Sequence, residues 1–478
     1  MMTQAGEEWD AIVVGGGVAG LVAARELAIT GLRTVVLEAW SGPGGVVGRH
    51  QVDGLTLDAG AESFATRGGV VADLAGELGL TSKVVSPEPY GAWVRLPGGV
   101  GPLPRTGLLG IPAHPFAADV RRTIGWTGSL RAAMDRLLPS GHGIRPEDEV
   151  TTLADLVRAR MGRRVLDRLV RPVVAGVHAA EPEAIAADAV APGLVASTRA
   201  EGALSLAVRA LRANTPAGSA VNSLDGGLHT LVDALVEDLE ARGGQLRTGT
   251  EVTAVHRVPG AARFRVEAGG QLLSATRLVV ATPRATDLLT EVAPEIAGLH
   301  TDPGADIVLA TLVLDAPGLD GHPRGTGVLV AKDVTDVQAK ALTHATAKWG
   351  WLARTAGPGR HVVRLSYGRA GEGAPALPED LAPLALRDAS KILGVPLSES
   401  QLRAFTRKSW RQSLPVPSAA HRETVRRVLD AVADVPGLAV TGAWVAGNGL
   451  ASVVPDARRV AAALAQADPA AASTRRTR

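Results

Sequence analysis

The chain has 478 residues, and at about 150 residues per domain this length predicts two or three domains. It contains no cysteine, which excludes disulfide scaffolds, cysteine nucleophiles, iron–sulfur clusters and thiolate zinc sites. The net charge is only +2, and basic residues are dense only at Arg475-Arg476-Thr477-Arg478. We therefore expect no nucleic-acid partner, since such a partner requires a clustered basic surface.

The first apolar run, Ala11 to Val14, is typical of a strand buried on both faces. A glycine-rich turn and a helical pattern ending before Gly31 follow it, and Thr34 to Leu37 is a second apolar run. This order predicts a strand–turn–helix–strand unit. Gly15, Gly17 and Gly20 give that turn the spacing G-x-G-x-x-G.

Each feature of this turn has a physical use in binding a dinucleotide. Gly15 permits the tight turn, Gly17 lets the backbone approach a pyrophosphate, and Gly20 lets helix and strand pack closely. The free N–H groups of the helix N-terminus attract phosphates. Glu38, at the end of the second strand, would accept hydrogen bonds from ribose hydroxyls. The alternative, a glycine-rich turn without a ligand, does not account for this complete context.

The fingerprint alone leaves FAD and NAD open as cofactors. A second glycine cluster, Gly42 to Gly48, directly follows the Glu38 strand. Near the other end, the apolar strand Leu438 to Thr441 precedes Gly442, Gly447 and Gly449 and then a helix. A flavin nucleotide has a long ribityl chain and profits from a second helix N-terminus, so both features favour FAD.

The rest of the chain alternates between helical and strand patterns. Helices are predicted over 69–80, in pieces over 113–215, over 228–241, over 379–393 and up to about residue 467. Strands are predicted within 86–112, 245–281, 305–315, 327–331 and 361–367. No uninterrupted apolar stretch reaches the roughly 18 residues of a membrane-spanning helix, and the polar first residues do not resemble a secretory signal. We therefore expect a cytoplasmic protein with at most peripheral membrane contact.

At this point a resemblance becomes visible, which extends over almost the whole chain. Its motifs are Val36-Leu37-Glu38-Ala39, Gly44-Gly45, Asp58-Ala59-Gly60-Ala61-Glu62-Ser63-Phe64, Pro102-Leu103-Pro104, Gly110-Ile111-Pro112, Arg171-Pro172-Val173-Val174-Ala175-Gly176, Gly325-Thr326-Gly327-Val328-Leu329 and Lys348-Trp349. The array resembles the monoamine-oxidase-like flavoproteins, and most closely the bacterial coproporphyrinogen and protoporphyrinogen oxidases. The glycine motifs are shared with amine oxidases, whereas the segments 102–178 and 325–349 are more specific.

The resemblance implies an α/β (α+β overall) fold with a Rossmann-type FAD-binding domain that is discontinuous in sequence. Residues 1–75, 217–288 and 430–467 would form this domain. Residues 76–112 and 289–429 would form a mixed-sheet substrate domain, and residues 113–216 a helical cap with possible membrane contact. The tail 468–478 is expected to be disordered.

The resemblance also implies the residues that contact non-covalently bound FAD. They are Gly15, Gly16, Gly17, Val18, Ala19, Gly20, Glu38, Ala39, Gly45, Gly60, Ala61, Glu62, Val252, Trp410, Gly442, Gly449, Leu450 and Ala451. Because there is no cysteine, a cysteine–flavin linkage is excluded.

Thr326, Gly327 and Leu329 would form part of a substrate face. Relatives that make protoporphyrin often carry Phe at the Thr326 position, so Thr326 favours coproporphyrinogen. A substrate with four propionates needs a cationic rim, for which Arg67, Arg95 and Arg105 are candidates. The alternative is that each is an ordinary surface arginine. Trp93 would either line the substrate cavity or cover core.

The implied activity is the FAD- and O2-dependent six-electron oxidation of coproporphyrinogen III to coproporphyrin III, with release of hydrogen peroxide, in haem biosynthesis. The flavin carries the redox chemistry, so no catalytic residue is assigned with certainty and no metal is expected. Protoporphyrinogen IX oxidation is the alternative, and an amine oxidase or desaturase is a weaker one. Expected partners are the porphyrinogen, O2 and, transiently, a ferrochelatase. The oligomeric state, monomer or homodimer, stays open.

Two features depart from the resemblance or leave it open. Many relatives carry Arg-Lys where this chain has Arg67 followed by Gly68, so a basic contact to the substrate is missing or supplied elsewhere. Lys348-Trp349 could be the lysine that amine oxidases place near the flavin, or a structural pair as in the porphyrinogen oxidases; we favour the structural interpretation.

Overall fold

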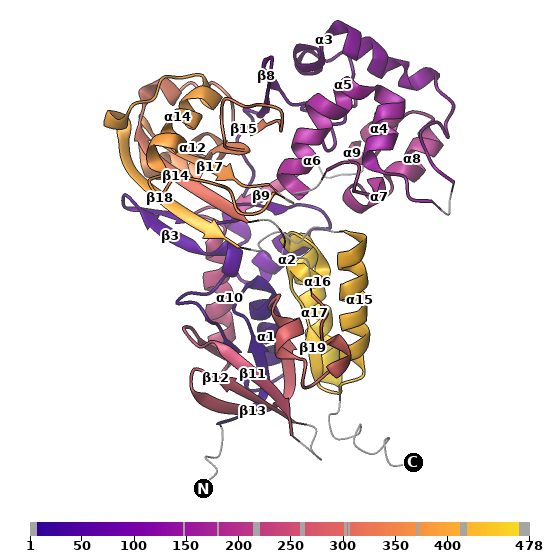
Figure 1. Cartoon of the computed structure of the whole chain (residues 1–478). Coiled ribbons are helices and arrows are strands. Elements are labelled where there is room, and N and C mark those ends of the chain that lie inside the picture. Colours follow the sequence, from indigo (N-terminus) through magenta and orange to yellow (C-terminus); the bar gives the residue numbers. More distant parts are fainter. Residues whose placement is uncertain are drawn as a thin grey trace.

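The computed structural model describes residues 7–146, 149–178, 181–213, 220–258, 263–300, 304, 306–369, 372–411 and 418–467. Figure 1 shows three bodies: a lower body built on one sheet, an upper body built on a second sheet, and a purely helical body beside the second. The tail 468–478, predicted to be disordered, lies outside the described residues.

The lower sheet has seven strands in the order β10-β2-β1-β13-β12-β11, with β19 also paired to β13. The strands are β1 (Glu7–Val14), β2 (Thr34–Leu37), β10 (Gln245–Arg247), β11 (Val252–Arg257), β12 (Phe264–Ala268), β13 (Gln271–Val280) and β19 (Leu438–Val440). The pairs β1–β2, β2–β10, β1–β13 and β13–β19 are parallel, so the continuous apolar runs of the sequence form its buried centre.

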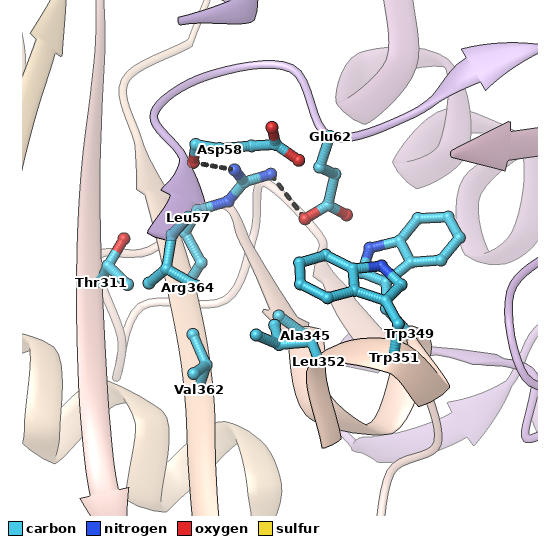
Figure 2. Close-up of a pocket in the computed structure, with 10 residues that line it drawn as sticks. All are labelled: Leu57, Asp58, Glu62, Thr311, Ala345, Trp349, Trp351, Leu352, Val362 and Arg364. Atoms are coloured by element: carbon cyan, nitrogen blue, oxygen red, sulfur yellow. Dashed lines mark hydrogen bonds and ion pairs between the residues drawn. The ribbon is translucent and has the colours of Figure 1, made fainter. Parts of the chain in front are cut away.

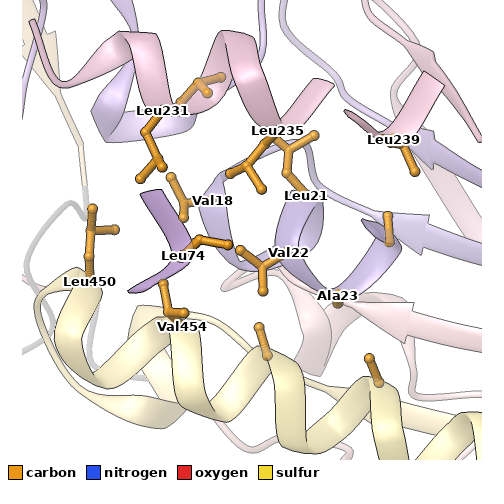
Figure 3. Close-up of a cluster of buried hydrophobic side chains, with 14 of the residues drawn as sticks. Val18, Leu21, Val22, Ala23, Leu74, Leu231, Leu235, Leu239, Leu450 and Val454 are labelled. Atoms are coloured by element: carbon orange, nitrogen blue, oxygen red, sulfur yellow. The ribbon is translucent and has the colours of Figure 1, made fainter. Parts of the chain in front are cut away.

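Four helices cover one face of this sheet and share one core (Figure 3). They are α1 (Val18–Ile29), α2 (Val70–Glu77), α10 (His229–Ala241) and α17 (Leu450–Gln466). Leu21 and Val22 of α1 are fully buried, and Leu235 and Val454 are packed in the same cluster from α10 and α17. Helix α15 (Ala419–Ala433) contributes Val425 and Val428 to the core on the opposite face.

The upper sheet also has seven strands, in the order β18-β14-β17-β16-β15-β7-β8. The strands are β7 (Ala92–Leu96), β8 (Gly99–Pro102), β14 (Ile307–Asp315), β15 (Gly327–Val330), β16 (Ala341–His344), β17 (Arg360–Tyr367) and β18 (Leu402–Trp410). Only the pair β15–β7 is parallel, so this is a mixed sheet. Helix α14 (Ala382–Leu393) packs on it through Leu384, Ala385 and Ile392.

The helical body has a core of its own. Its members are α3 (Ala118–Ala133), a 3₁₀ turn η3 (Met134–Leu137), α4 (Leu153–Met161), α5 (Arg163–Val165), a π-helical turn η4 (Leu166–Val170), α6 (Arg171–His178), α7 (Ala187–Val190), α8 (Leu194–Glu201) and α9 (Leu204–Ala213). Fully buried Arg160 pairs with Asp135 at 3.3 Å. Asp135 also accepts from the backbone N–H groups of Leu204 and Ser205 and thereby caps α9.

Shorter elements connect the bodies. They are the hairpin β3 (Arg49–Val52) and β4 (Leu55–Asp58), the small strands β5 (Phe64–Ala65), β6 (Val84–Val85) and β9 (Val221–Leu224), and the helices α11 (Ala285–Leu288), α12 (Ala345–Lys348), α13 (Gly350–Ala356) and α16 (Ala443–Ala446). The expected fold class is confirmed, because the lower sheet takes its strands from three separate parts of the chain. The exact domain limits stay predictions.

Candidate active site

The turn between β1 and α1 has the geometry that its glycines predict. Gly15 has φ = +104°, a conformation that favours glycine. A Cβ atom on Gly20 would lie only 1.9 Å from the carbonyl oxygen of Gly15, whereas one on Gly17 would meet no atom within 4 Å. Gly20 therefore allows helix and strand to pack, and Gly17 faces open space. Val18 and Ala19 begin α1, where the first N–H groups have no partner within a helix.

Glu38 lies beside this turn, directly after β2. Its Oε2 accepts from the backbone N–H of Gly16 at 2.6 Å, and its Oε1 accepts from that of Trp40 at 2.8 Å. An ionised carboxylate has about four acceptor positions, so hydroxyl groups of a ribose can still bind to it. Ala39 follows it in the same loop.

The second glycine cluster packs against the first. The N–H of Gly44 donates to the carbonyl of Gly16 at 2.8 Å, and a Cβ on Gly45 would lie 3.6 Å from the Cα of Gly17. The N–H of Ala61 in turn bonds the carbonyl of Val46. A continuous backbone surface thus runs from the first turn to the segment that carries Gly60, Ala61 and Glu62.

The C-terminal glycine segment, predicted to contact the flavin, lies at the start of α17. Gly442 and Gly449 have φ values of +122° and +98°, and Leu450 and Ala451 open the helix. Arg67 lies there as well, since its Nη2 is 3.4 Å from the Oγ of Ser452. Arg67 is thus beside the predicted cofactor site rather than in the cavity described below.

Trp410, on β18 of the upper sheet, lies against the segment around Gly60 that is predicted to contact the cofactor. Its Nε1 donates to the carbonyl of Ala59 at 2.9 Å, and a Cβ on Gly60 would lie 3.2 Å from its ring. The ring stacks on that of Trp40 with centroids 5.8 Å apart. By contrast, the side chain of Val252 is buried in the sheet core, so only its backbone is left to meet a ligand.

A buried charge cluster lies next to these segments (Figure 2). Glu62 pairs through Oε1 with Lys348 Nζ at 2.7 Å and through Oε2 with Arg364 Nη2 at 2.9 Å. Burial alone would raise the pKa of Glu62, but Arg364 and Lys348 outweigh burial and lower this pKa to about 2. Arg364 also donates to the carbonyls of Asp58 and Gly60. Sequence reasoning missed Arg364, which lies in an ordinary alternating strand.

A cavity of about 500 Å³ opens between the β7–β8 hairpin and α3, a size within the usual range of small-molecule sites. Trp93 and Arg105 line it, and His114 and Arg122 of the helical body add two further basic groups. Asp119 lies there too, but its carboxylate accepts from the backbone N–H groups of Arg105 and Val120. Most of the other residues that line the cavity are apolar. The cavity wall is thus mainly apolar, and its basic groups form one edge.

Thr326, Gly327 and Leu329, the other residues expected to bind substrate, do not all face the cavity, because side chains alternate between the two faces of a strand. Thr326 Oγ1 donates to the carbonyl of Gly91, at the edge of the cavity. Val328 and Val330 face the core on which Trp93 packs, so Gly327 and Leu329 point to the other face, where Leu329 approaches Gly176 of α6. Trp93 therefore does not share one face with Leu329.

Arg95 does not belong to this cavity. Its guanidinium pairs with Asp336 at 2.6 Å and donates to the carbonyl of Lys391. Both of its partners belong to the outer part of the upper body. Within the described part of the chain, no group of three or more His, Asp or Glu side chains is placed to hold a metal ion.

The comparison with known proteins is decisive for the family. The family described as flavin containing amine oxidoreductase matches residues 18–467. The chain belongs to this family. Its expected cofactor, FAD, and its class, an oxidoreductase, are thereby confirmed. The open side of Gly17 and the backbone surface around it fit such a cofactor.

Several proteins of known name or structure are similar to this chain over nearly its whole length. Coproporphyrinogen III oxidase of Mycobacterium tuberculosis is 30% identical over 474 residues, which cover 95% of this chain and 97% of the relative. The enzyme of the same name from Bacillus subtilis is 25% identical, with 92% and 94% covered. The crystal structure of a candidate protoporphyrinogen oxidase from Exiguobacterium has a TM-score of 0.81 and 26% identity, with 97% of this chain and 99% of that chain covered.

Proposed function

We propose that this flavoprotein oxidises coproporphyrinogen III to coproporphyrin III with FAD and O2, releasing hydrogen peroxide, as a cytoplasmic step of haem biosynthesis. The observation that carries the proposal is the 30% identity to a coproporphyrinogen III oxidase over nearly the full length of both chains. Transient contact with a ferrochelatase would deliver the product to iron insertion.

The reaction balances with O2 as the oxidant. Conversion of a porphyrinogen to a porphyrin removes six electrons and six protons, so three molecules of O2 become three of hydrogen peroxide. When bound, FAD supplies the redox chemistry by accepting two electrons at a time and passing them to O2. The protein then has to bind the macrocycle, orient it and neutralise its carboxylates.

The basic edge of the cavity suits a substrate with several propionates. Arg105, Arg122 and His114 can each donate to a carboxylate, and arginine does so through two parallel hydrogen bonds. Leu329 would offer an apolar surface to the ring on the other face of β15, whereas Gly327 is buried against Leu342 of β16. Lys348 and Arg364, both held by Glu62, keep a fixed positive charge beside the predicted cofactor site.

Protoporphyrinogen IX is the second candidate substrate, because the Exiguobacterium neighbour is described as an oxidase of that compound. It has two propionates where coproporphyrinogen has four. An amine substrate is disfavoured in this family member, because Trp444, the aromatic residue near the C-terminal flavin segment, is buried in the core instead.

The test compares both porphyrinogens on the purified holoenzyme, with porphyrin fluorescence and O2 uptake as readouts. We expect faster turnover of coproporphyrinogen III. Arg105→Gln should raise the KM for coproporphyrinogen about tenfold, equivalent to ~1.4 kcal/mol, and the KM for protoporphyrinogen less. Arg95→Gln is the matched control, since Arg95 is bound to Asp336 outside the cavity. Faster turnover of protoporphyrinogen would assign that compound as the substrate. If the holoenzyme oxidises neither compound, the proposed function is wrong.

A further inference from the structure

Two buried histidines lie side by side in the upper sheet. His344 is on β16 and His361 is on β17, and they are 0% and 4% exposed, respectively. Nε2 of His344 lies 3.0 Å from Nδ1 of His361. On the solvent side, Oδ1 of Asp320 lies 2.9 Å from Nε2 of His361, and the side chain of Asp320 is 58% exposed. An aspartate at the surface is thus joined to two imidazoles in the core.

The hydrogen bonds assign a proton position to each ring. A carboxylate only accepts hydrogen bonds, so Nε2 of His361 carries a hydrogen and its Nδ1 is an acceptor. Nε2 of His344 then donates to that Nδ1, and Nδ1 of His344 carries no hydrogen. This last atom is buried and has no hydrogen-bond partner in the described part of the chain. The arrangement therefore accommodates both imidazoles only in the neutral form.

A proton on either ring would disturb this arrangement. On His361 it would face the N–H group of His344, and on His344 it would bury a donor that has no acceptor. Burial, together with His361 and His322, lowers the pKa of His344 to about 3. Burial also lowers the pKa of His361, although Asp320 acts in the opposite direction. Both rings are therefore neutral at pH 7.

The loop that carries Asp320 follows the pair. It consists of residues 320–326, between the 3₁₀ turn η6 (Pro317–Leu319) and β15, and we call it the clasp loop. The ring of His322 packs against that of His344 with centroids 5.7 Å apart. His322 has φ = +48°, a conformation that a residue other than glycine keeps only where its contacts enforce it. The clasp loop is thus held on the two histidines at two points.

The other end of the clasp loop forms the edge of the substrate cavity. The N–H and Oγ1 groups of Thr326 both donate to the carbonyl of Gly91, at 2.8 and 2.9 Å. The N–H of His344 donates to the carbonyl of Thr326 at 3.1 Å. Tyr90 contacts His322, with ring centroids 4.3 Å apart, and Tyr90 and Gly91 line the cavity. A movement of the histidine pair therefore reaches the cavity through the clasp loop.

The groups around the pair offer no counter-charge to a proton on His344. The neighbouring elements bring three polar side chains to the pair: Asp320 and His322 of the clasp loop and Thr346 of α12. Oγ1 of Thr346 lies 3.3 Å from Nδ1 of His361 and is uncharged. Arg324, also on the clasp loop, lies over Trp93, 5.1 Å from its ring centroid. Among the described residues, no carboxylate contacts His344.

We propose that His344 and His361 position the edge of the substrate cavity: while both rings are neutral they hold the clasp loop closed, and a proton taken up by either ring releases the loop and weakens substrate binding. They are positioning residues, since they act through the clasp loop and do not line the cavity. The effect on substrate rests on the proposed function, whereas the release of the loop does not.

The direction of the pH dependence follows from the lowered pKa values. Both rings have a pKa below the ordinary 6.5 while the clasp loop is closed, so the closed state is fully stable above pH 6.5 and is weakened as the pH falls. Each ring can weaken it by up to about tenfold per pH unit below 6.5. We therefore expect the KM for porphyrinogen to rise between pH 7.5 and pH 5.5. Protonation of His114 in the cavity would act in the opposite direction, because it attracts carboxylates.

A dye on the clasp loop tests its release without any substrate. The chain has no cysteine, and a Cβ on exposed Gly321 would meet no atom within 4 Å, so Gly321→Cys supplies one labelling site. We expect the fluorescence anisotropy of the labelled holoprotein to fall between pH 7.5 and pH 5.5. Asp333→Cys, at another exposed position of the upper body, is the matched control and should show no fall. Adding His344→Gln, which keeps a donor for His361 but takes up no proton, should reduce the fall at position 321.

Steady-state kinetics test the effect on the cavity. Asp320→Ala removes the surface end of the clasp, so it should raise the KM for coproporphyrinogen about fivefold at pH 7.5 with kcat within about twofold. At pH 5.5, where the wild type is released as well, the two KM values should agree within about twofold. Comparing both proteins at each pH cancels the titration of the substrate. Asp333→Ala should behave like the wild type, and flavin absorbance shows that each holoprotein is intact.

Three results would overturn the proposal. They are equal anisotropy at both pH values, a fall in anisotropy that His344→Gln does not reduce, and a release of the clasp loop that leaves KM unchanged. If the holoenzyme oxidises neither porphyrinogen, the proposed function fails. The anisotropy then still decides whether His344 and His361 release the clasp loop.

Discussion

At the scale of single residues, the carboxylate of Glu62 has a structural role beside the flavin contact that its motif predicts. The resemblance predicts a flavin contact, but both of its carboxylate oxygens are bound by Lys348 and Arg364. Removing one partner of such a buried cluster leaves uncompensated charge, which is more damaging than the cluster itself is stabilising. Glu62 therefore holds two cations in place beside the predicted cofactor site.

We predict that Glu62→Gln lowers the free energy of unfolding at pH 7 by about 3–5 kcal/mol, since Lys348 and Arg364 lose their counter-charge. The pKa of Glu62 falls from 4.5 to about 2 on folding, so its stabilisation is complete above pH 4.5 and is lost as the pH falls towards 2. That pH-dependent part is on the order of 3 kcal/mol. Urea unfolding at several pH values measures both effects.

The variant should therefore lose less stability than the wild type between pH 4.5 and 3. Exposed Glu237 on α10 provides the control, because Glu237→Gln should change neither the stability at pH 7 nor its pH profile. Parallel pH profiles of the wild type and Glu62→Gln would contradict the assignment.

At the scale of elements, the glycines of the β1–α1 unit have two different roles: some allow close packing, and others face the predicted ligand. Gly20 lies against the carbonyl of Gly15, while Gly17, with an ordinary φ of −68°, faces open space. The two positions of one motif thus serve packing and binding, respectively.

We expect Gly17→Ala to keep the stability of the protein but to lower its affinity for FAD about tenfold or more, because the new methyl group occupies the side from which a pyrophosphate approaches. Gly20→Ala should instead lower the free energy of unfolding by about 1–3 kcal/mol through overpacking. Flavin fluorescence titration and urea unfolding distinguish the two. Equal FAD affinity of Gly17→Ala and wild type would place the phosphates elsewhere.

At the scale of the whole molecule, the helical body meets the upper sheet through a close contact. A Cβ on Gly176 of α6 would lie 2.9 Å from Cδ2 of Leu329 on β15. The absence of a side chain at position 176 lets the two bodies approach there. Leu329 is thereby held at the face predicted to receive substrate.

We predict that Gly176→Ala raises the KM for porphyrinogen about threefold, equivalent to ~0.6 kcal/mol, because Leu329 must move. Stability should not fall, since alanine favours the helix over glycine. Adding Leu329→Ala should abolish the effect of the first change, and the double-mutant cycle measures this coupling. Additive effects would show that the contact does not shape the substrate face.

The sequence by itself determined the features that depend on contiguous residues. The β1–α1 turn, the place of Glu38 and the late glycine segment follow from local spacing, because a turn and the helix that it opens involve neighbouring residues. The buried parallel strands were recognisable as continuous apolar runs. Together with the resemblance, these patterns were sufficient for the fold class and the cofactor.

Only the tertiary structure decided which distant side chains meet. Lys348 reaches Glu62 across 286 positions of sequence, and Arg364 has no local signal that separates it from other strand arginines. Pairing with Asp336 also keeps Arg95 out of the cavity, and the packing of the helical body brings in Arg122 and His114. Contacts between distant residues depend on how sheets and helices pack. Local periodicity predicts which face of an element is buried, but not which other element this face will contact.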